Sequence, residues 1–136
     1  MLATAKAAQV GGCVLILLDC EDSCPATLGP DLLQRARAVR DNVDIFVVLA
    51  YREFETWFIA AAHSLRGLRA LPRDLDPPDN TERIRDAKGW LGRRMNVAYD
   101  PVTHQLEFTR VFDMQQARLC PSFDRLYRRI QAFIWT

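Results

Sequence analysis

Two short apolar runs in the first half of the chain predict the core of its fold. Residues 13–18 (CVLILL) are all apolar, and residues 43–51 (VDIFVVLAY) are mostly apolar and β-branched. Runs of this length beside glycines or turn residues are typical of strands that are buried on both faces. Between them, Pro30 opens a predicted helix that continues to about Arg40, with an apolar face made by Leu32, Leu33, Ala36 and Val39.

Acidic residues follow both predicted strands. Asp19, Glu21 and Asp22 come after the first strand, and Glu53 and Glu55 come after the second. A strand–helix–strand unit is parallel and right-handed in nearly all cases. Its two strands therefore end at the same edge of the sheet, about 4.8 Å apart. We expect these acids, although far apart in sequence, to lie close together.

Carboxylates that gather at one place repel one another unless a cation or a proton neutralises them. Mg²⁺ and Mn²⁺ prefer hard oxygen ligands, and ligands of α/β proteins collect outside the carboxyl ends of parallel strands. The sequence therefore predicts a Mg²⁺ or Mn²⁺ site made by Asp19, Glu21, Asp22, Glu53 and Glu55. The alternative is that the first three acids only open a loop, and that the two glutamates only favour the dipole of the helix that they begin.

A metal site of this kind suits phosphodiester chemistry, because the metal activates water and stabilises the charge that develops on phosphoryl oxygens. Asp19, Glu21 and Glu53 are the candidate catalytic residues. Lys88 and Arg52 are the candidate contacts to phosphate or nucleic acid. The alternative for these cations is a solvated helix face with no further role.

The second half of the chain is expected to be helical throughout. Residues 66–81 contain three prolines and predict a surface loop, and residues 99–103 (YDPVT) predict a turn. Trp57, Trp90 and Phe123 are expected in the core. Further helices are predicted over residues 1–10, over residues 54–65, from Thr81 to about Met95, over residues 104–112, from about Met114, and from Pro121, with Ser122 as its expected N-cap.

The composition sets the broad class of the protein. A chain of 136 residues with 49% hydrophobic residues suits one soluble domain. Its net charge of +1 provides no general attraction to nucleic acid or to a membrane. No apolar run approaches the roughly 20 residues of a membrane span, so we expect a cytoplasmic protein. The four cysteines lack the spacing of a zinc site and are interpreted as reduced thiols.

Five stretches of the chain together resemble an uncharacterised bacterial family, domain of unknown function 4276, within the Toprim-like group. They are LLDCEDSCPATLGPDLL, VVLAYREFETWFIAAA, DAKGWLGRRM, YDPVTHQ and CPSFDRL. The resemblance implies an α/β fold: a small parallel sheet of a Toprim-like core flanked by helices, with a helical C-terminal half. It implies a single domain over residues 1–136, with a βαβ-containing core over residues 1–65 and a helical part over residues 81–136.

The resemblance also implies a function. Relatives such as topoisomerases, primases and nucleases of the overcoming-lysogenisation-defect type bind Mg²⁺ for phosphodiester chemistry. The Toprim acidic pair falls on Asp19 and Glu21, and the second acidic motif of the family falls on Glu53 and Glu55. The implied function is a Mg²⁺-dependent nuclease-like protein that acts on nucleic acid, in phage defence beside an ATPase partner or as a homodimer.

The sequence departs from the family pattern in three ways. Glu21 stands where an aspartate is usual, and His104 stands where an acid is more common. We expect no counterpart before Cys13 of the strand that ends in a catalytic glutamate in Toprim domains, so either the chain is a shortened member or another chain supplies that strand. The missing strand supports an alternative function, that of a shortened, catalytically inactive protein that binds a partner protein. A third reading, an aspartate-nucleophile phosphotransferase, ranks last because it requires an aspartate where Glu21 stands.

Overall fold

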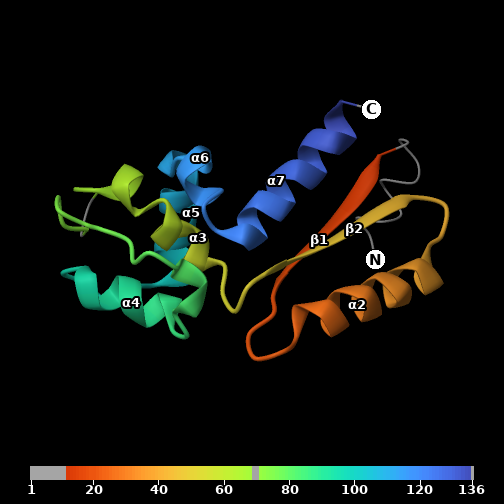
Figure 1. Ribbon diagram of the computed structural model, residues 1–136, viewed down its shortest axis with the longest axis horizontal. Helices are drawn as coiled ribbons and strands as arrows, with labels where there is room; N and C mark the ends of the chain where they lie inside the picture. The colour runs from red at the N-terminus through yellow and green to blue at the C-terminus, as the bar shows by residue number, and fades with distance from the viewer. Residues whose placement is uncertain (1–11, 69–70, 136) are drawn as a thin grey trace.

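A parallel pair of strands forms the sheet of this protein. The structure is a computed structural model, and it describes residues 12–68 and 71–135. Strand β1 (Cys13–Asp19) pairs with strand β2 (Asp44–Ala50) from Cys13 opposite Asp44 to Asp19 opposite Ala50. Helix α2 (Pro25–Val39) connects them. The predicted βαβ unit is confirmed, and both strands end at the same edge of the sheet (Figure 1).

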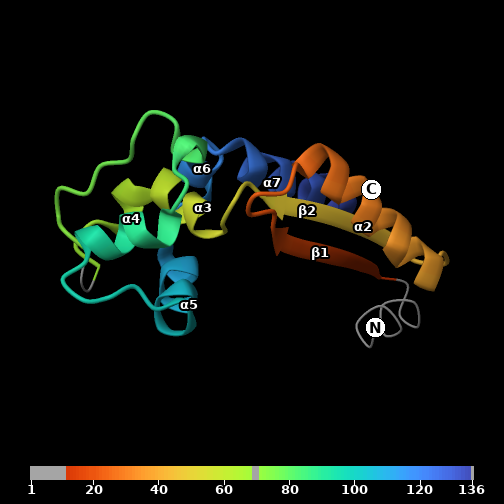
Figure 2. The ribbon, with the colours of Figure 1, turned by 90° about the horizontal axis from the view of Figure 1, so that it is seen from below.

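Helices make up the rest of the described chain, which confirms an α/β fold with a helical C-terminal half. Helices α3 to α6 gather beyond the carboxyl ends of the strands, whereas α7 runs back along the sheet (Figures 1 and 2). In order, the elements are α3 (Glu55–Ala60), η1 (Ala62–Leu65), η2 (Thr81–Arg83), α4 (Ala87–Arg94), α5 (Pro101–Val111), α6 (Met114–Ala117) and α7 (Pro121–Ile134), where η marks a 3₁₀ helix.

Helix α2 begins five residues before its predicted start. Cys24 is its N-cap and Pro25 its first residue, so Pro30 lies inside the helix. The prediction was wrong because two prolines compete for the first-turn position, where the missing N–H costs nothing. Because Pro30 has no N–H, it gives the carbonyl of Ala26 no helical hydrogen bond.

Several other helix boundaries also differ from the predictions. The helix predicted from Thr81 is a 3₁₀ turn followed by α4, which Asp86 caps by accepting a hydrogen bond from Gly89 N–H at 2.8 Å. The predicted turn at residues 99–103 contains the first turn of α5, with Asp100 as its N-cap. The helix predicted over residues 54–65 is α3 continued by η1.

The core lies mainly in the helical part and on β2. Trp57, Trp90 and Phe123 are buried there, as predicted. Strand β1 contradicts its prediction, because it has no buried residue, and Leu15 and Leu18 are 40% and 46% exposed. Both helices that pack on the sheet, α2 and α7, pack mainly against β2, so within residues 12–68 and 71–135 β1 is less covered than β2.

Three further predictions concern the first ten residues, membrane spans and the cysteines. The helix predicted over residues 1–10 lies outside the described residues. Within residues 12–68 and 71–135, no helix is long and apolar enough to cross a membrane. Cys13, Cys20, Cys24 and Cys120 are all free thiols.

Candidate functional site

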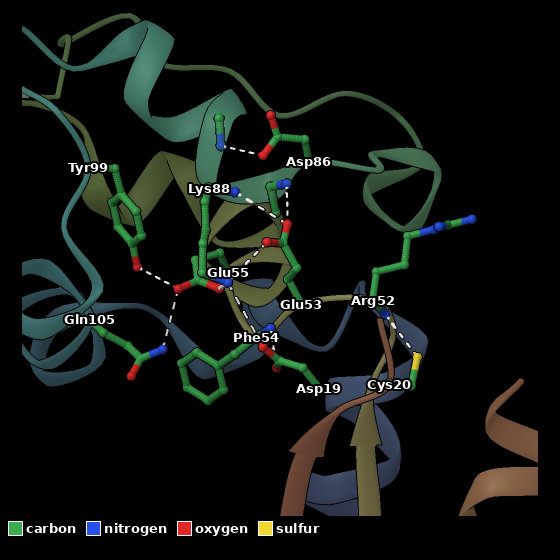
Figure 3. A network of polar contacts seen from close by, with 12 residues as sticks. Asp19, Cys20, Arg52, Glu53, Phe54, Glu55, Asp86, Lys88, Tyr99 and Gln105 are labelled. Carbon is green, nitrogen blue, oxygen red and sulfur yellow. Dashed lines mark hydrogen bonds and ion pairs between the residues drawn. The ribbon is translucent and has the colours of Figure 1, made fainter. Parts of the chain in front are cut away.

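The segments that follow the two strands are joined by hydrogen bonds. Phe54 N–H donates to Asp19 Oδ1 at 2.7 Å, and Arg52 N–H donates to Cys20 Sγ at 3.1 Å (Figure 3). Glu21 N–H also donates to the carbonyl oxygen of Arg52 at 2.9 Å. These bonds fix the start of α3 beside the end of β1.

Two residues in these segments adopt left-handed backbone conformations. Glu21 has a φ of 49° and Arg52 a φ of 63°, in a region that costs residues with a side chain about 1 kcal/mol or more. The bond between their main chains holds both residues in this conformation. Strained backbone of this kind is concentrated where a fold positions functional side chains.

An ammonium group lies at the centre of the acidic cluster. Lys88, in the first turn of α4, places its Nζ 3.0 Å from Glu53 Oε1 and 3.1 Å from Glu55 Oε2. Asp19 Oδ2 is 4.0 Å from the same nitrogen. We call Asp19, Glu53, Glu55 and Lys88 the carboxylate–lysine cluster (Figure 3). The predicted meeting of acids from both strand ends is therefore present for Asp19, Glu53 and Glu55.

Glu53 also anchors α4 directly. Its Oε2 accepts hydrogen bonds from the main-chain N–H groups of Ala87 and Lys88, at 2.5 and 3.4 Å. These groups belong to the first turn of α4, where helical N–H groups lack intrahelical partners. A carboxylate placed there is favoured by the helix dipole. Glu53 thus positions the helix that carries Lys88.

Glu55 is the most deeply buried member of the cluster. Its side chain is fully buried, and its Oε1 accepts hydrogen bonds from Tyr99 OH at 2.8 Å and from Gln105 Nε2 at 3.4 Å. Its Oε2 lies 3.1 Å from the Lys88 ammonium. A buried carboxylate needs such compensation, because burial of an unpaired charge is very costly.

The surroundings of the cluster shift three pKa values. Burial raises the pKa of Asp19, against the opposing effects of Phe54 N–H and Lys88. Burial alone would lower the pKa of Lys88, but its hydrogen bonds to Glu53 and Glu55 outweigh that effect and raise it. Burial, the negative charge of Glu55 and the hydrogen bond to Glu55 raise the pKa of Tyr99. At neutral pH Tyr99 is therefore a neutral donor.

Glu21 and Asp22 do not join the cluster. Both are exposed, and Asp22 pairs with Arg52 at 3.4 Å. They line an adjoining polar pocket of about 210 Å³, whose wall also includes Arg52, Glu53, Arg85 and Lys88. Of the two predicted phosphate contacts, Arg52 thus borders the pocket, and Lys88 lies between the pocket and the acids.

Three side chains make contacts that the sequence did not predict. Tyr99 and Gln105, which support Glu55, were not identified from the sequence because no spacing links them to the acidic motifs. Ser122 was predicted to be the N-cap of α7. This prediction is wrong, because Cys120 takes that position. The Ser122 hydroxyl instead accepts a hydrogen bond from Trp57 Nε1 at 2.8 Å in the core.

Both histidines make contacts outside the cluster. His63 Nε2 lies 2.5 Å from Asp76 Oδ1 near the surface, and His104 Nδ1 accepts a hydrogen bond from Asp100 N–H at 2.8 Å. Residues 12–68 and 71–135 contain no group of three or more His, Cys, Asp or Glu arranged to hold a metal ion.

The fold and this site define a small α/β protein whose acidic residues meet around a lysine at the carboxyl end of a parallel sheet. Comparison with curated proteins and with solved structures gives no match. The chain belongs to the family described as domain of unknown function (DUF4276), whose family model matches residues 3–131.

Proposed function

We propose that the carboxylate–lysine cluster is the active site of a divalent-metal-dependent hydrolase that acts on phosphodiesters of nucleic acid. One observation carries this proposal. Three carboxylates from two segments of the chain lie around one cation position, with oxygens of Asp19, Glu53 and Glu55 within 3.0 to 4.0 Å of Lys88 Nζ.

The donor set fits Mg²⁺ or Mn²⁺ in chemistry and in charge. Asp19, Glu53 and Glu55 offer only hard oxygen donors, which these ions prefer. Three carboxylates face one ammonium, so the cluster has a net charge of −2 when all three acids are ionised, which one divalent cation would neutralise. Because the ammonium lies among these oxygens, we propose that a divalent ion competes with Lys88 for them.

The adjoining pocket supports a phosphate as the group that is bound. Arg52, Arg85 and Lys88 contribute three cations to its wall, which Glu21, Asp22 and Glu53 also line, and its volume of about 210 Å³ accommodates a phosphate group. Arg52 pairs with Asp22 and Lys88 with Glu53, so a phosphate would compete with these acids for the two cations. Arginine matches phosphate oxygens with paired N–H donors. When bound, the divalent ion would supply activation of water and stabilisation of phosphoryl charge. Tyr99 would keep Glu55 oriented toward the cluster by its hydrogen bond.

The resemblance to Toprim-like proteins supports the choice of nucleic acid as the substrate class and of an ATPase as the partner in phage defence. We propose Asp19 and Glu53 as catalytic residues together with Glu55. Glu21 and Asp22 stand at the rim of the pocket, where they would meet the bound nucleic acid rather than the ion held by the cluster.

A second function is favoured by the position of Lys88. The ammonium already partly neutralises the acids, so the fold does not require an added ion. This observation suits a catalytically inactive protein that binds a partner, in which the cluster only stabilises the junction between the sheet and α4. The two functions differ in whether a divalent ion changes the stability of the protein.

A thermal-shift titration with Mn²⁺ separates these functions. Saturation to ten times the dissociation constant stabilises a protein with one site by about 1.4 kcal/mol, which raises its melting temperature by several degrees. Asp19→Asn should abolish the shift, because the amide keeps an acceptor for Phe54 N–H but removes the charge. Asp41→Asn, in the exposed turn before β2, is the matched control and should shift like the wild type.

A cleavage assay tests the reaction itself. Labelled single-stranded and double-stranded DNA should be cut by the wild type and by Asp41→Asn only when Mn²⁺ or Mg²⁺ is present, and not by Asp19→Asn or Glu53→Gln. A Mn²⁺-induced shift of equal size in the wild type and in Asp19→Asn would overturn the proposed site. The absence of any shift in the wild type, together with no cleavage, would favour the inactive partner-binding protein.

A further inference from the structure

The outer edge of β2 has no neighbouring strand. Within the described chain the sheet contains only β1 and β2, so β2 has a free edge opposite β1. The carbonyl of Ala50 accepts a hydrogen bond from Cys20 N–H and therefore points toward β1. Because main-chain groups alternate in direction along a strand, Ile45, Val47 and Leu49 direct their N–H and C=O groups to the free edge.

Helices α2 and α7 form the two walls beside this edge. On one side Phe46 packs against Phe133 of α7, with ring centroids 5.9 Å apart. On the other side Leu49 lies next to Gly29 of α2. A Cβ added to Gly29 would lie 3.8 Å from Leu49 Cδ1, which is an ordinary van der Waals contact. Figure 1 shows the two helices on opposite sides of the sheet.

A groove of about 380 Å³ follows the edge between these walls. Its floor includes Ile45, Phe46, Val47 and Leu49, and its walls include Pro25, Gly29 and Leu33 of α2. A second hollow of about 430 Å³ shares Pro25, Leu49 and Arg125 with it, so the groove continues toward the carboxyl end of β2. The floor is apolar, but the strand edge offers a row of main-chain donors and acceptors.

Three arginines that line the groove have no carboxylate partner in the part of the chain that the structure describes. Arg37 projects from α2, and Arg125 and Arg129 project from α7. None of them takes part in an ion pair among the described residues, although Arg35 and Arg128 on the same two helices do. The Arg129 guanidinium lies over the Phe46 ring, 6.0 Å from its centroid. The groove therefore combines an apolar floor with positive charge on both walls.

We propose that this groove binds an extended, acidic segment of a partner protein, which adds to β2 as a third strand. The main-chain groups of Ile45, Val47 and Leu49 would form the ladder of hydrogen bonds. Apolar side chains of the segment would contact the floor, and its carboxylates would pair with Arg37 on one wall and with Arg125 and Arg129 on the other. This surface is separate from the carboxylate–lysine cluster, and the inference does not depend on the proposed activity.

Charge favours this occupant over a second copy of the chain. The exposed strand of another copy, β1, reads CVLILLD and carries a single acid, Asp19, at its end. Asp19 is also engaged by Phe54 N–H. Such a strand would cover the apolar floor but leave most of the arginines unpaired.

The experiment measures the binding of a fluorescein-labelled peptide, EVTVTEV, to the full chain by fluorescence anisotropy. The peptide matches the seven residues of β2 in length, and its glutamates at positions 1 and 6 lie on opposite faces of an extended strand, one toward each wall. One control peptide carries N-methyl groups on its valines, which removes main-chain donors and keeps the charge. A second control replaces both glutamates by glutamine. Both controls should bind at least about fivefold more weakly, because each removes one of the two sets of contacts.

Protein variants locate the site. The double variant Arg37→Glu with Arg125→Glu should weaken binding of the acidic peptide at least tenfold. Arg110→Glu, on an exposed position of α5, should not change it. Bound peptide should also slow hydrogen exchange of the Val47 and Leu49 amides. The proposal would be overturned if the N-methylated peptide bound as tightly as the unmodified one, or if the double variant bound the acidic peptide as tightly as the wild type. It would also be overturned if the chain associated with itself and the double variant lost that association.

Discussion

Lys88 Nζ lies 3.1 Å from Oε2 of the fully buried Glu55. The two residues are brought together because α3 begins directly after β2 and α4 packs against α3. A buried carboxylate that loses its cationic neighbour keeps its desolvation cost and loses its compensation. The pair is therefore the first place to test what stabilises this junction.

Lys88→Met should lower the free energy of unfolding by about 2–3 kcal/mol at pH 7. The loss should be smaller than for a fully buried pair, because the Lys88 side chain is 38% exposed. Urea denaturation followed by circular dichroism measures it. Arg93→Met, in the same helix and paired with Asp86 at the surface, should change stability by less than about 0.5 kcal/mol.

The same variant tests the proposed competition between Lys88 and a divalent ion. Without the ammonium, Mn²⁺ should bind more tightly and restore part of the lost stability, so its thermal shift should exceed that of the wild type. A Lys88→Met protein that is as stable as the wild type without any ion would contradict the central position given to this lysine.

Tyr99→Phe should change how stability depends on alkaline pH. The folded protein holds the Tyr99 proton at pH values where the unfolded chain, with a pKa near 10.0, releases it. Above pH 10 the native state then binds more protons than the unfolded state. The stabilising contribution of Tyr99 to the free energy of unfolding is therefore fully present below pH 10 and is lost as the pH rises above it. The slope is at most about 1.4 kcal/mol per pH unit for one proton. Lys88, whose pKa is also raised, adds to the fall at higher pH.

The variant should therefore show a shallower decline between pH 10 and 11 than the wild type. At pH 7 it should be less stable by about 1.5–3 kcal/mol, because Glu55 loses its shortest hydrogen bond. Urea midpoints across this pH series give both quantities. Parallel curves for the two proteins above pH 10 would refute the role assigned to the Tyr99 hydroxyl.

Ser122→Ala should destabilise the core by about 1–3 kcal/mol. The substitution leaves the buried Trp57 Nε1–H without its acceptor. Thermal unfolding measures the effect, and Ser23→Ala in the exposed turn before α2 is the control. A loss no larger than that of the control would show that Trp57 finds another partner.

Cys24 should react with iodoacetamide faster than the other three cysteines. It is exposed at the N-terminus of α2, and hydrogen bonds from Ala26 N–H and from Thr27 lower the pKa of its thiol. The thiolate is the reactive form. Cys20 and Cys120 are buried, and burial raises the pKa of Cys120. Mass spectrometry of peptides after brief alkylation at pH 7.5 should find the label first on Cys24; a label that appears first on Cys120 would contradict this order.

The meeting of the acids was predictable from the sequence because it follows from chain direction alone. Two strands with a helix between them are parallel neighbours in nearly all cases, and Asp19 and Glu53 stand at or just after their carboxyl ends. The role of Lys88 was only half predictable. Its position on a helix near the acids could be inferred, but its placement between them depends on α4 packing against α3.

Other features depend on contacts that no local pattern reveals. Serine is a common N-cap residue, but Pro121 takes the first helical position of α7 and Cys120 is the N-cap. The Ser122 hydroxyl instead accepts a hydrogen bond from Trp57, which is 65 residues away. The apolar run at residues 13–18 resembles a doubly buried strand, but both covering helices pack on β2. Tyr99 reaches Glu55 across 44 residues. Burial and pairing over such separations are properties of the whole fold.

The separation of the cluster residues along the chain also affects how the protein is made. Asp19, Glu53 and Glu55 leave the ribosome well before Lys88, which supplies their counter-charge, and before Tyr99 and Gln105, which donate hydrogen bonds to Glu55. A nascent chain that ends before α4 therefore holds these acids without a counter-charge, and their mutual repulsion opposes docking of α3 against the strand ends. Completion of the junction must wait for translation of α4 and α5, so this part of the molecule forms late in biosynthesis.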